Sequence, residues 1–119
     1  MYIYYFEKLD VWQNARNVTK DIYWLTKRFP TEEKFGLVSQ LRRAISSVTV
    51  NIAEGMSRRT SKDRKHMLNI AFSSAIEVIN FLILSLDLDF ISNEEYLDLR
   101  NKLELITNQL KKLGENIKA

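Results

Sequence analysis

The sequence contains no cysteine, a single proline (Pro30), three glycines and a single histidine (His66) among its 119 residues. The lack of cysteine excludes disulfide bonds and thiolate metal sites. One histidine is too few for a multi-histidine metal site. So little proline and glycine favours a few long elements over many short strands joined by tight turns. The length fits a single domain, residues 1–119, with one hydrophobic core.

Long apolar runs and strong charge of one sign are also missing. The most apolar stretch, 75–86, contains Glu77, Asn80 and Ser85, and it is shorter than the roughly 20 residues of a membrane-spanning helix. The N-terminus shows neither the basic region nor the apolar core of a signal peptide. The net charge of +3 is mild, so charge alone does not indicate nucleic-acid binding. We expect a cytoplasmic protein without a membrane partner.

Four segments place apolar residues at the three- and four-residue steps typical of a helix. The first segment ends at Pro30, and Thr31 is a suitable N-cap for the second, which Gly55 would end. The third begins near Thr60 or Ser61, and the fourth begins with a capping box at residues 92–95. Because short connections make neighbouring helices antiparallel, the sequence predicts an all-α, antiparallel up-down-up-down four-helix bundle.

The third segment is apolar on nearly every side. Beside its main stripe (Leu68, Ala71, Ala75, Val78, Leu82 and Leu86), it has Ile70, Phe72, Ile76, Ile79, Phe81, Ile83 and Leu84. Such a helix must be buried on more than one side. In a monomeric four-helix bundle each helix keeps a solvent face, so the pattern favours oligomerisation. The alternative is a helix at the centre of the fold.

Residues suited to catalysis do not gather in any recognisable pattern. The pairs Glu32–Glu33 and Glu94–Glu95 fall in first helical turns, where the helix dipole explains them. His66 follows Asp63 at carboxylate-x-x-His spacing, but a di-iron bundle needs two Glu-x-x-His motifs and two further carboxylates. There is no phosphate-binding loop of the GxxxxGK type. We predict no catalytic residue, no metal site, no cofactor and no enzymatic activity.

Three polar residues lie on or beside the apolar stripes: Asn51, Glu54 and Glu77. The structural interpretation is hydrogen bonding in or beside the core, with Arg42 or Arg43 as partners, because a buried charge must be paired. The functional interpretation is a buried catalytic carboxylate, which would need a second catalytic group.

The connection between the second and third segments is basic, with one acid, Asp63, among its cations. Cations at a helix start and acids at its end (Asp87 and Asp89) both oppose the helix dipole. Either an anionic partner binds there, or the loop is solvated and pairs with neighbouring acids. The loop has no aromatic residues, so it would contact the nucleic-acid backbone rather than stack on bases. The candidate nucleic-acid-binding residues are Arg42, Arg43, Arg58, Arg59, Lys62, Arg64 and Lys65.

Several motifs are familiar. FEKLDVWQNA (6–15), QLRRA (40–44), NIAEG (51–55) and AFSSAIE (71–77) resemble segments of the four-helix-bundle proteins encoded in intervening sequences of 23S ribosomal RNA. The resemblance covers essentially the whole chain. It implies a ring-like homopentamer, no enzymatic activity, and kinship with the accessory protein of diversity-generating retroelements, which binds nucleic acid and a reverse transcriptase. Thr49 and Ser73 stand where the family often has proline and glycine.

Three functions remain in competition. The leading one is an oligomeric protein that binds RNA or DNA through its basic residues. The second is a protein-interaction scaffold, with the aromatic segment 2–6 as an exposed adhesive edge. The third is a metal-dependent enzyme, for which the sequence offers the least support.

Overall fold

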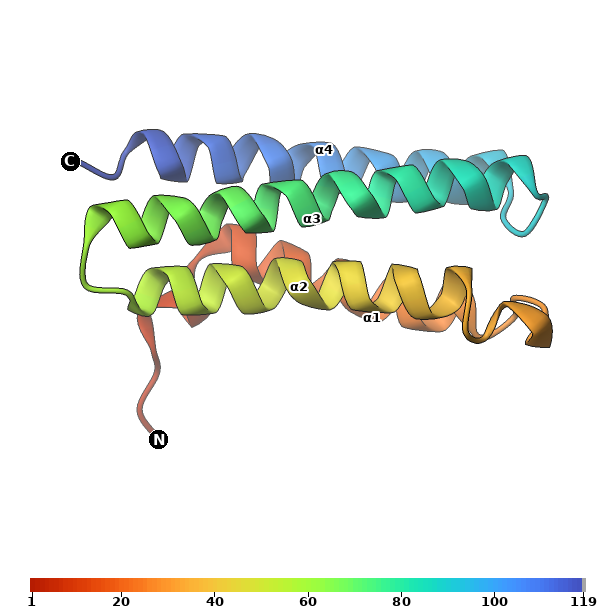
Figure 1. Cartoon of the computed structure of the whole chain (residues 1–119), viewed down its shortest axis with the longest axis horizontal. Helices are drawn as coiled ribbons and strands as arrows, with labels where there is room; N and C mark the ends of the chain where they lie inside the picture. The colour runs from red at the N-terminus through yellow and green to blue at the C-terminus, as the bar shows by residue number, and fades with distance from the viewer. Residues whose placement is uncertain (119) are drawn as a thin grey trace.

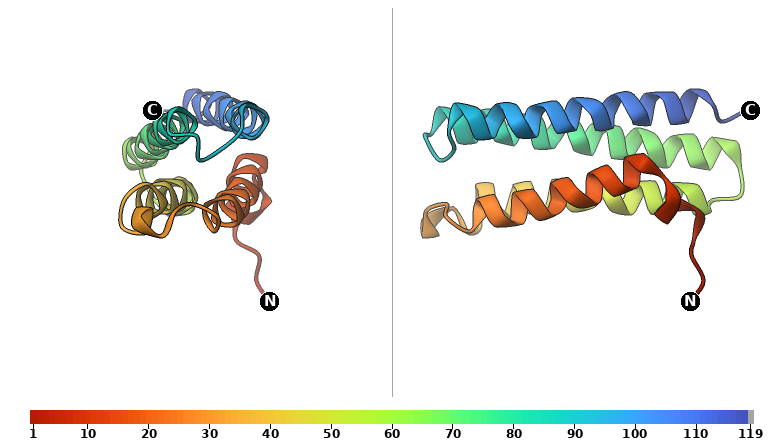
Figure 2. Two further views of the ribbon diagram at one scale, coloured as in Figure 1. Left: turned by 90° about the vertical axis from the view of Figure 1, so that its right-hand side faces the viewer. Right: turned by 180° about the vertical axis from the view of Figure 1, so that it is seen from behind.

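Four α-helices run alternately up and down around one apolar core (Figures 1 and 2). The computed structural model describes residues 1–118, and among these none forms a β-strand. The helices are α1 (Asp10–Thr26), α2 (Leu37–Ser57), α3 (Ser61–Asp87) and α4 (Asn93–Glu115), with short 3-10 helices η1 (Tyr5–Lys8) and η2 (Thr31–Glu33). The bundle measures 44 × 29 × 21 Å. The predicted all-α, antiparallel four-helix architecture is confirmed.

Most of the core comes from apolar residues at the predicted three- and four-residue steps, but Leu86, predicted in the main stripe of the third segment, is only half-buried. The largest fully buried side chains come from all four helices, and the aliphatic ones are Val18, Ile22, Leu41, Ile45, Val48, Ile52, Val78, Leu82, Leu103 and Ile106. Fully burying one such side chain stabilises the fold by about 1.5–3 kcal/mol. Viewed along their axes, the helices stand at the corners of a square, each with one face turned inward (Figure 2, left).

Small residues bring α2 and α3 close together. The hydroxyls of Ser47 and Ser74 hydrogen-bond at 2.9 Å, and Asn51 donates to the Ser47 carbonyl and hydroxyl. Nearer the loop, a Cβ added at Gly55 would lie 3.0 Å from the Met67 Cβ. The prediction that Gly55 ends the helix is wrong, since α2 continues to Ser57. Gly55 is needed because the two backbones approach each other there.

The start of α2 also differs from the prediction. Thr31 does not cap α2; it opens η2, in which the Glu33 and Lys34 amides donate to the carbonyls of residues 30 and 31. The helix begins at Leu37, after Gly36. The Glu33 carboxylate accepts from the Leu37 amide at 3.2 Å, so it takes the role that a capping side chain would have. A carboxylate there also suits the positive end of the helix dipole.

Glu95 joins the start of α4 to the end of α1. Its backbone amide donates to the Ser92 hydroxyl and its carboxylate accepts from the Ser92 amide, which confirms the predicted capping box. The same carboxylate pairs with Arg28, just beyond α1. Hydrogen bonds from Arg28 and from the Ser92 amide lower the pKa of Glu95 from 4.5 to about 2. One side chain therefore both caps α4 and ties α1 to it.

Helix α3 keeps an apolar face that the other helices do not cover. Ile76, Ile83 and Leu84 are 47%, 38% and 41% exposed, although Ala71, Ala75, Val78 and Leu82 are buried. By length and composition alone α3 could cross a membrane, a test that the core helix of a soluble protein also passes. The sequence argument that its apolar stretch is too short rested on 75–86, whereas the helix extends over Ser61–Asp87.

The glycines of α2 and α4 should respond oppositely to substitution. We expect Gly55→Ala to lower the free energy of unfolding by about 0.5–2 kcal/mol, because overpacking outweighs the helix propensity of alanine. Gly114→Ala should raise it by up to about 1 kcal/mol, because no atom lies within 4 Å of the added Cβ. Urea unfolding at one protein concentration measures both. Equal effects of the two substitutions would contradict the close approach at Gly55.

Glu95 should make stability depend on pH in a defined window. Because its pKa is lower in the folded protein than the ordinary 4.5, it stabilises the fold above that pH, and this contribution is lost as the pH falls toward about 2. The difference in unfolding free energy between wild type and Glu95→Gln should be full at neutral pH and shrink below pH 4.5. Glu94→Gln is the matched control. A difference that is constant with pH would show that Glu95 is not paired.

Candidate nucleic-acid interface

The loop that joins α2 to α3 is ordered by its own polar contacts. Thr60 caps α3 by accepting from the Asp63 amide. Arg64 donates through Nε to the Arg58 carbonyl at 2.7 Å, and Arg58 lies 3.8 Å from the Glu54 carboxylate. Within residues 1–118, Arg59 makes no ion pair, and its side chain is exposed. The loop thus holds its backbone in place while leaving cationic groups in solvent.

The antiparallel topology brings further cations to this loop. The C-terminal end of α4 lies beside the start of α3 (Figure 1), and a groove of about 550 Å³ between them has Lys65 and Lys111 among its lining residues, over Leu68, Phe72 and Leu110. We call this region the basic end. It contains Lys8, Arg58, Arg59, Lys62, Arg64, Lys65, Lys111, Lys112 and Lys118, against the acids Glu7, Asp10, Glu54, Asp63 and Glu115.

Sequence reasoning missed the three C-terminal lysines of this region. These lysines are far from the loop in sequence, and only the up-down-up-down order places them beside it. That order was itself predicted, so combining it with the charge pattern would have found them. The position of Lys111 and Lys112 near the end of α4 is also stabilising, because cations suit the negative end of a helix dipole.

The opposite end of the bundle has the reverse charge. We call it the acidic end: it contains Glu32, Glu33, Asp87, Asp89, Glu94, Glu95 and Asp98, against Lys27, Arg28, Lys34, Arg42 and Arg43. The two ends are separated along the 44 Å long axis of the molecule. The mild net charge of +3 therefore hides a separation of charge along the bundle.

Two of the seven candidate residues do not lie at the basic end. Arg42 and Arg43 are in the second turn of α2, and the helical rise places them about 24 Å from Arg58. Arg42 donates to the Thr26 hydroxyl at 3.0 Å and the Tyr23 carbonyl at 3.3 Å, so it binds the C-terminal end of α1. The structure therefore brings together the five loop residues and separates these two from them.

Arg43 and Glu77 confirm one predicted pairing but correct its setting. Their charged groups lie 3.8 Å apart, and their side chains are 64% and 47% exposed. Glu77 faces solvent on the outer side of α3, so its predicted place in or beside the core is wrong. Glu54 is likewise exposed, whereas Asn51 bonds Ser47 between α2 and α3 as expected. A buried catalytic carboxylate is not formed by Glu54 or Glu77.

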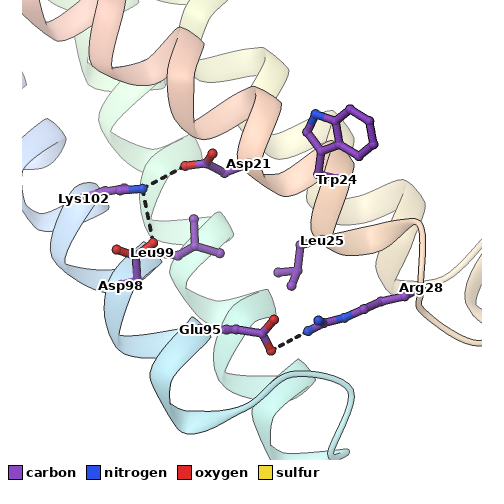
Figure 3. Close-up of a pocket in the computed structure, with 8 residues that line it drawn as sticks. All are labelled: Asp21, Trp24, Leu25, Arg28, Glu95, Asp98, Leu99 and Lys102. Carbon is purple, nitrogen blue, oxygen red and sulfur yellow. Dashed lines mark hydrogen bonds and ion pairs between the residues drawn. The ribbon is translucent and has the colours of Figure 1, made fainter.

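A cleft of about 350 Å³ lies between α1 and α4 (Figure 3). Three carboxylates and two cations line it, and each carboxylate has a cationic partner. Lys102 Nζ lies 3.0 Å from Asp21 and 3.2 Å from Asp98, and both contacts raise the pKa of Lys102. Arg28 and Glu95 form the second pair. Because every charge here has a partner, the cleft joins two helices and offers no free charge to a ligand.

Metal-binding potential is low in the part of the chain that the structure describes. No group of three or more His, Asp or Glu side chains is placed to hold a metal ion in residues 1–118. His66 is exposed on the first turns of α3.

The comparisons with known proteins agree with the motifs. Residues 7–112 match the family model of the 23S rRNA-intervening sequence protein. A crystal structure from Bacteroides thetaiotaomicron, of a protein with unknown function from the S23 ribosomal protein family, has a TM-score of 0.83 and 26% sequence identity; the match covers 89% of this chain and 96% of that one. No curated protein matches.

Proposed function

Because this chain belongs to the 23S rRNA-intervening sequence protein family, we propose that it is a non-enzymatic, oligomeric protein whose basic end binds the phosphate backbone of RNA or DNA. The observation that supports this most is the separation of charge. The loop cations and the C-terminal lysines gather at one end, although cations at the start of α3 oppose its dipole. An anionic partner would account for a charge pattern that the helix itself does not favour.

Oligomerisation would make this weak surface effective. A modest basic patch gains avidity when several copies engage one polyanion together. The exposed face of α3, with Ile76, Ile83 and Leu84, is the apolar surface best suited to contacts between copies. The family resemblance implies five copies, and kinship with the retroelement accessory protein makes a reverse transcriptase a further partner to test.

The loop should control both affinity and salt dependence. We expect the double substitution Arg58→Glu, Arg59→Glu to weaken binding to labelled RNA and DNA at least about tenfold at low salt. It should also flatten the plot of log K against log salt by about 0.9 for each duplex phosphate that the variant no longer neutralises. Titrations at several salt concentrations measure both quantities.

The matched control is Arg16→Glu, Lys20→Glu on the exposed side of α1, which changes the net charge equally. It should weaken binding less, because both of its charges lie on the side of α1 and outside the loop between α2 and α3. If both double variants bind alike, only net charge matters and the loop is not the site. No binding by the wild-type protein at low salt would make the proposed function wrong.

Self-association through α3 has its own test. We expect Ile76→Glu, Ile83→Glu to lower the mass measured by sedimentation while leaving the helical circular-dichroism signal unchanged, because both side chains are exposed on one face. Leu105→Glu, at a residue 51% exposed on α4, is the control. A wild-type monomer, or an α3 variant with the wild-type mass, would contradict this interface.

The N-terminal segment favours a second candidate, a protein-interaction scaffold. Tyr2, Ile3 and Tyr4 are 76%, 55% and 60% exposed, and the segment extends away from the bundle (Figure 1). Its rings pack on one another, with the centroids of Tyr2 and Tyr4 4.9 Å apart. A stoichiometric protein partner that survives nuclease treatment, and no longer binds the variant Tyr2→Ser, Tyr4→Ser, would favour this function over nucleic-acid binding.

A further inference from the structure

The turn between α1 and α2 contains a shallow cleft of about 230 Å³, away from the basic end. All three charged side chains that line it are cations: Lys27, Lys34 and Arg42. They belong to the end of the bundle where acids otherwise predominate. The local charge of the cleft is thus opposite to that of its surroundings.

Each of these cations forms a cation–π contact with an aromatic ring. Lys27 Nζ lies 4.0 Å from the centroid of Trp24, the Arg42 guanidinium lies 4.6 Å from that of Tyr23, and Lys34 Nζ lies 5.6 Å from that of Phe35. Such contacts stabilise by about 0.5–1 kcal/mol at exposed sites. The aromatic residues missing from the basic loop are therefore found beside this cleft, each against one of its cations. Trp24, Tyr23 and Phe35 do not themselves line the cleft, and Trp24 also borders the α1–α4 cleft. We call the cleft together with these neighbouring rings the aromatic cleft.

The fold does not need all of these rings. Trp24 is 69% exposed and Phe35 is 88% exposed, so neither contributes much to the core. Glu95 and Leu99 lie on the opposite side of the α1–α4 cleft, and the Trp24 indole points away from them (Figure 3). Arg42 has a structural role through its bonds to α1, whereas Lys27 and Lys34 each lie over an exposed ring. Exposed aromatic rings beside cations are the pattern of proteins that bind single strands.

We propose that this cleft binds unpaired nucleotides, with Lys27, Lys34 and Arg42 contacting phosphates and Trp24 and Phe35 stacking on bases. This inference rests on the proposed function and extends it. The basic end contacts only backbone, so it accepts duplex and single strands alike. The aromatic cleft accepts only single strands, because the bases of a duplex are stacked on one another. Since about 24 Å of α2 separates Arg42 from Arg58, the two surfaces contact different parts of one nucleic acid.

The test compares single-stranded and duplex RNA of the same sequence. We expect Trp24→Leu to weaken binding of oligouridine and oligoadenine by about 5- to 150-fold, the equivalent of about 1–3 kcal/mol per stacked base. Binding of the duplex should be unchanged. Lys34→Gln should weaken single-strand binding and lower its salt slope by about 0.7. Leu97→Ala, at a residue 55% exposed on α4, is the control and should change neither.

Fluorescence gives a direct readout. The chain has two tryptophans, so Trp12→Phe leaves Trp24 as the only one, and adding oligouridine should quench it whereas duplex RNA should not. If wild type binds both forms and Trp24→Leu alters neither, this inference is wrong and the proposed function stands. If wild type does not bind duplex RNA or single strands, the proposed function fails as well. If Trp24→Leu lowers the mass of the assembly in solution, Trp24 lies in a contact between copies and the inference is overturned.

Discussion

The close packing of α2 on α3 is the constraint on which the rest of the structure depends. Gly55, the Ser47–Ser74 hydrogen bond and the buried alanines leave little side-chain volume between the two helices. Tight contact restricts how they can shift along or turn about each other, because protein interiors tolerate few voids. The inner face of α3 is therefore fixed against α2. Apolar residues of α3 that face neither α2 nor α4, such as Ile76 and Ile83, are therefore exposed.

The same constraint organises the charges. Because α3 runs antiparallel to α2, the short loop between them lies at one end of the bundle. Helix α4 runs antiparallel to α3, so its C-terminal end lies at the same end as this loop. Lysines at the end of α4 and cations at the start of α3 then become neighbours. At the far end, Glu33 and Glu95 serve as helix caps, which requires acids in the first turns of η2 and α4. Local capping chemistry thus accounts for part of the acidic end. At the basic end the dipole of α4 accounts for Lys111 and Lys112, whereas the cations at the start of α3 oppose the dipole of their own helix.

Much of the fold could be predicted from the sequence because four amphipathic periods encode which faces are buried. The capping box at Ser92 was predictable because it depends on two side chains three residues apart. The start of α2 was not, because the Glu33 carboxylate competes with Thr31 for that role and only the three-dimensional path decides between them. The sequence predicted Glu77 in or beside the core because its neighbours in the chain are apolar. In a single copy, however, the side of α3 on which Glu77 lies is exposed. The loop cations were found by counting charge along the chain, but the aromatic cleft joins residues from two helices and their turn, which linear spacing does not reveal.

A molecule with opposite charges at its two ends behaves as a large electric dipole. In the field of a polyanion it experiences a torque as well as an attraction, so it turns before it touches. Productive encounters would then begin end-on, and their rate would fall as salt shortens the reach of the field, which is about 8 Å at physiological ionic strength. The separation of charge along the bundle would thus set the direction in which a polyanion is approached, as well as the affinity for it.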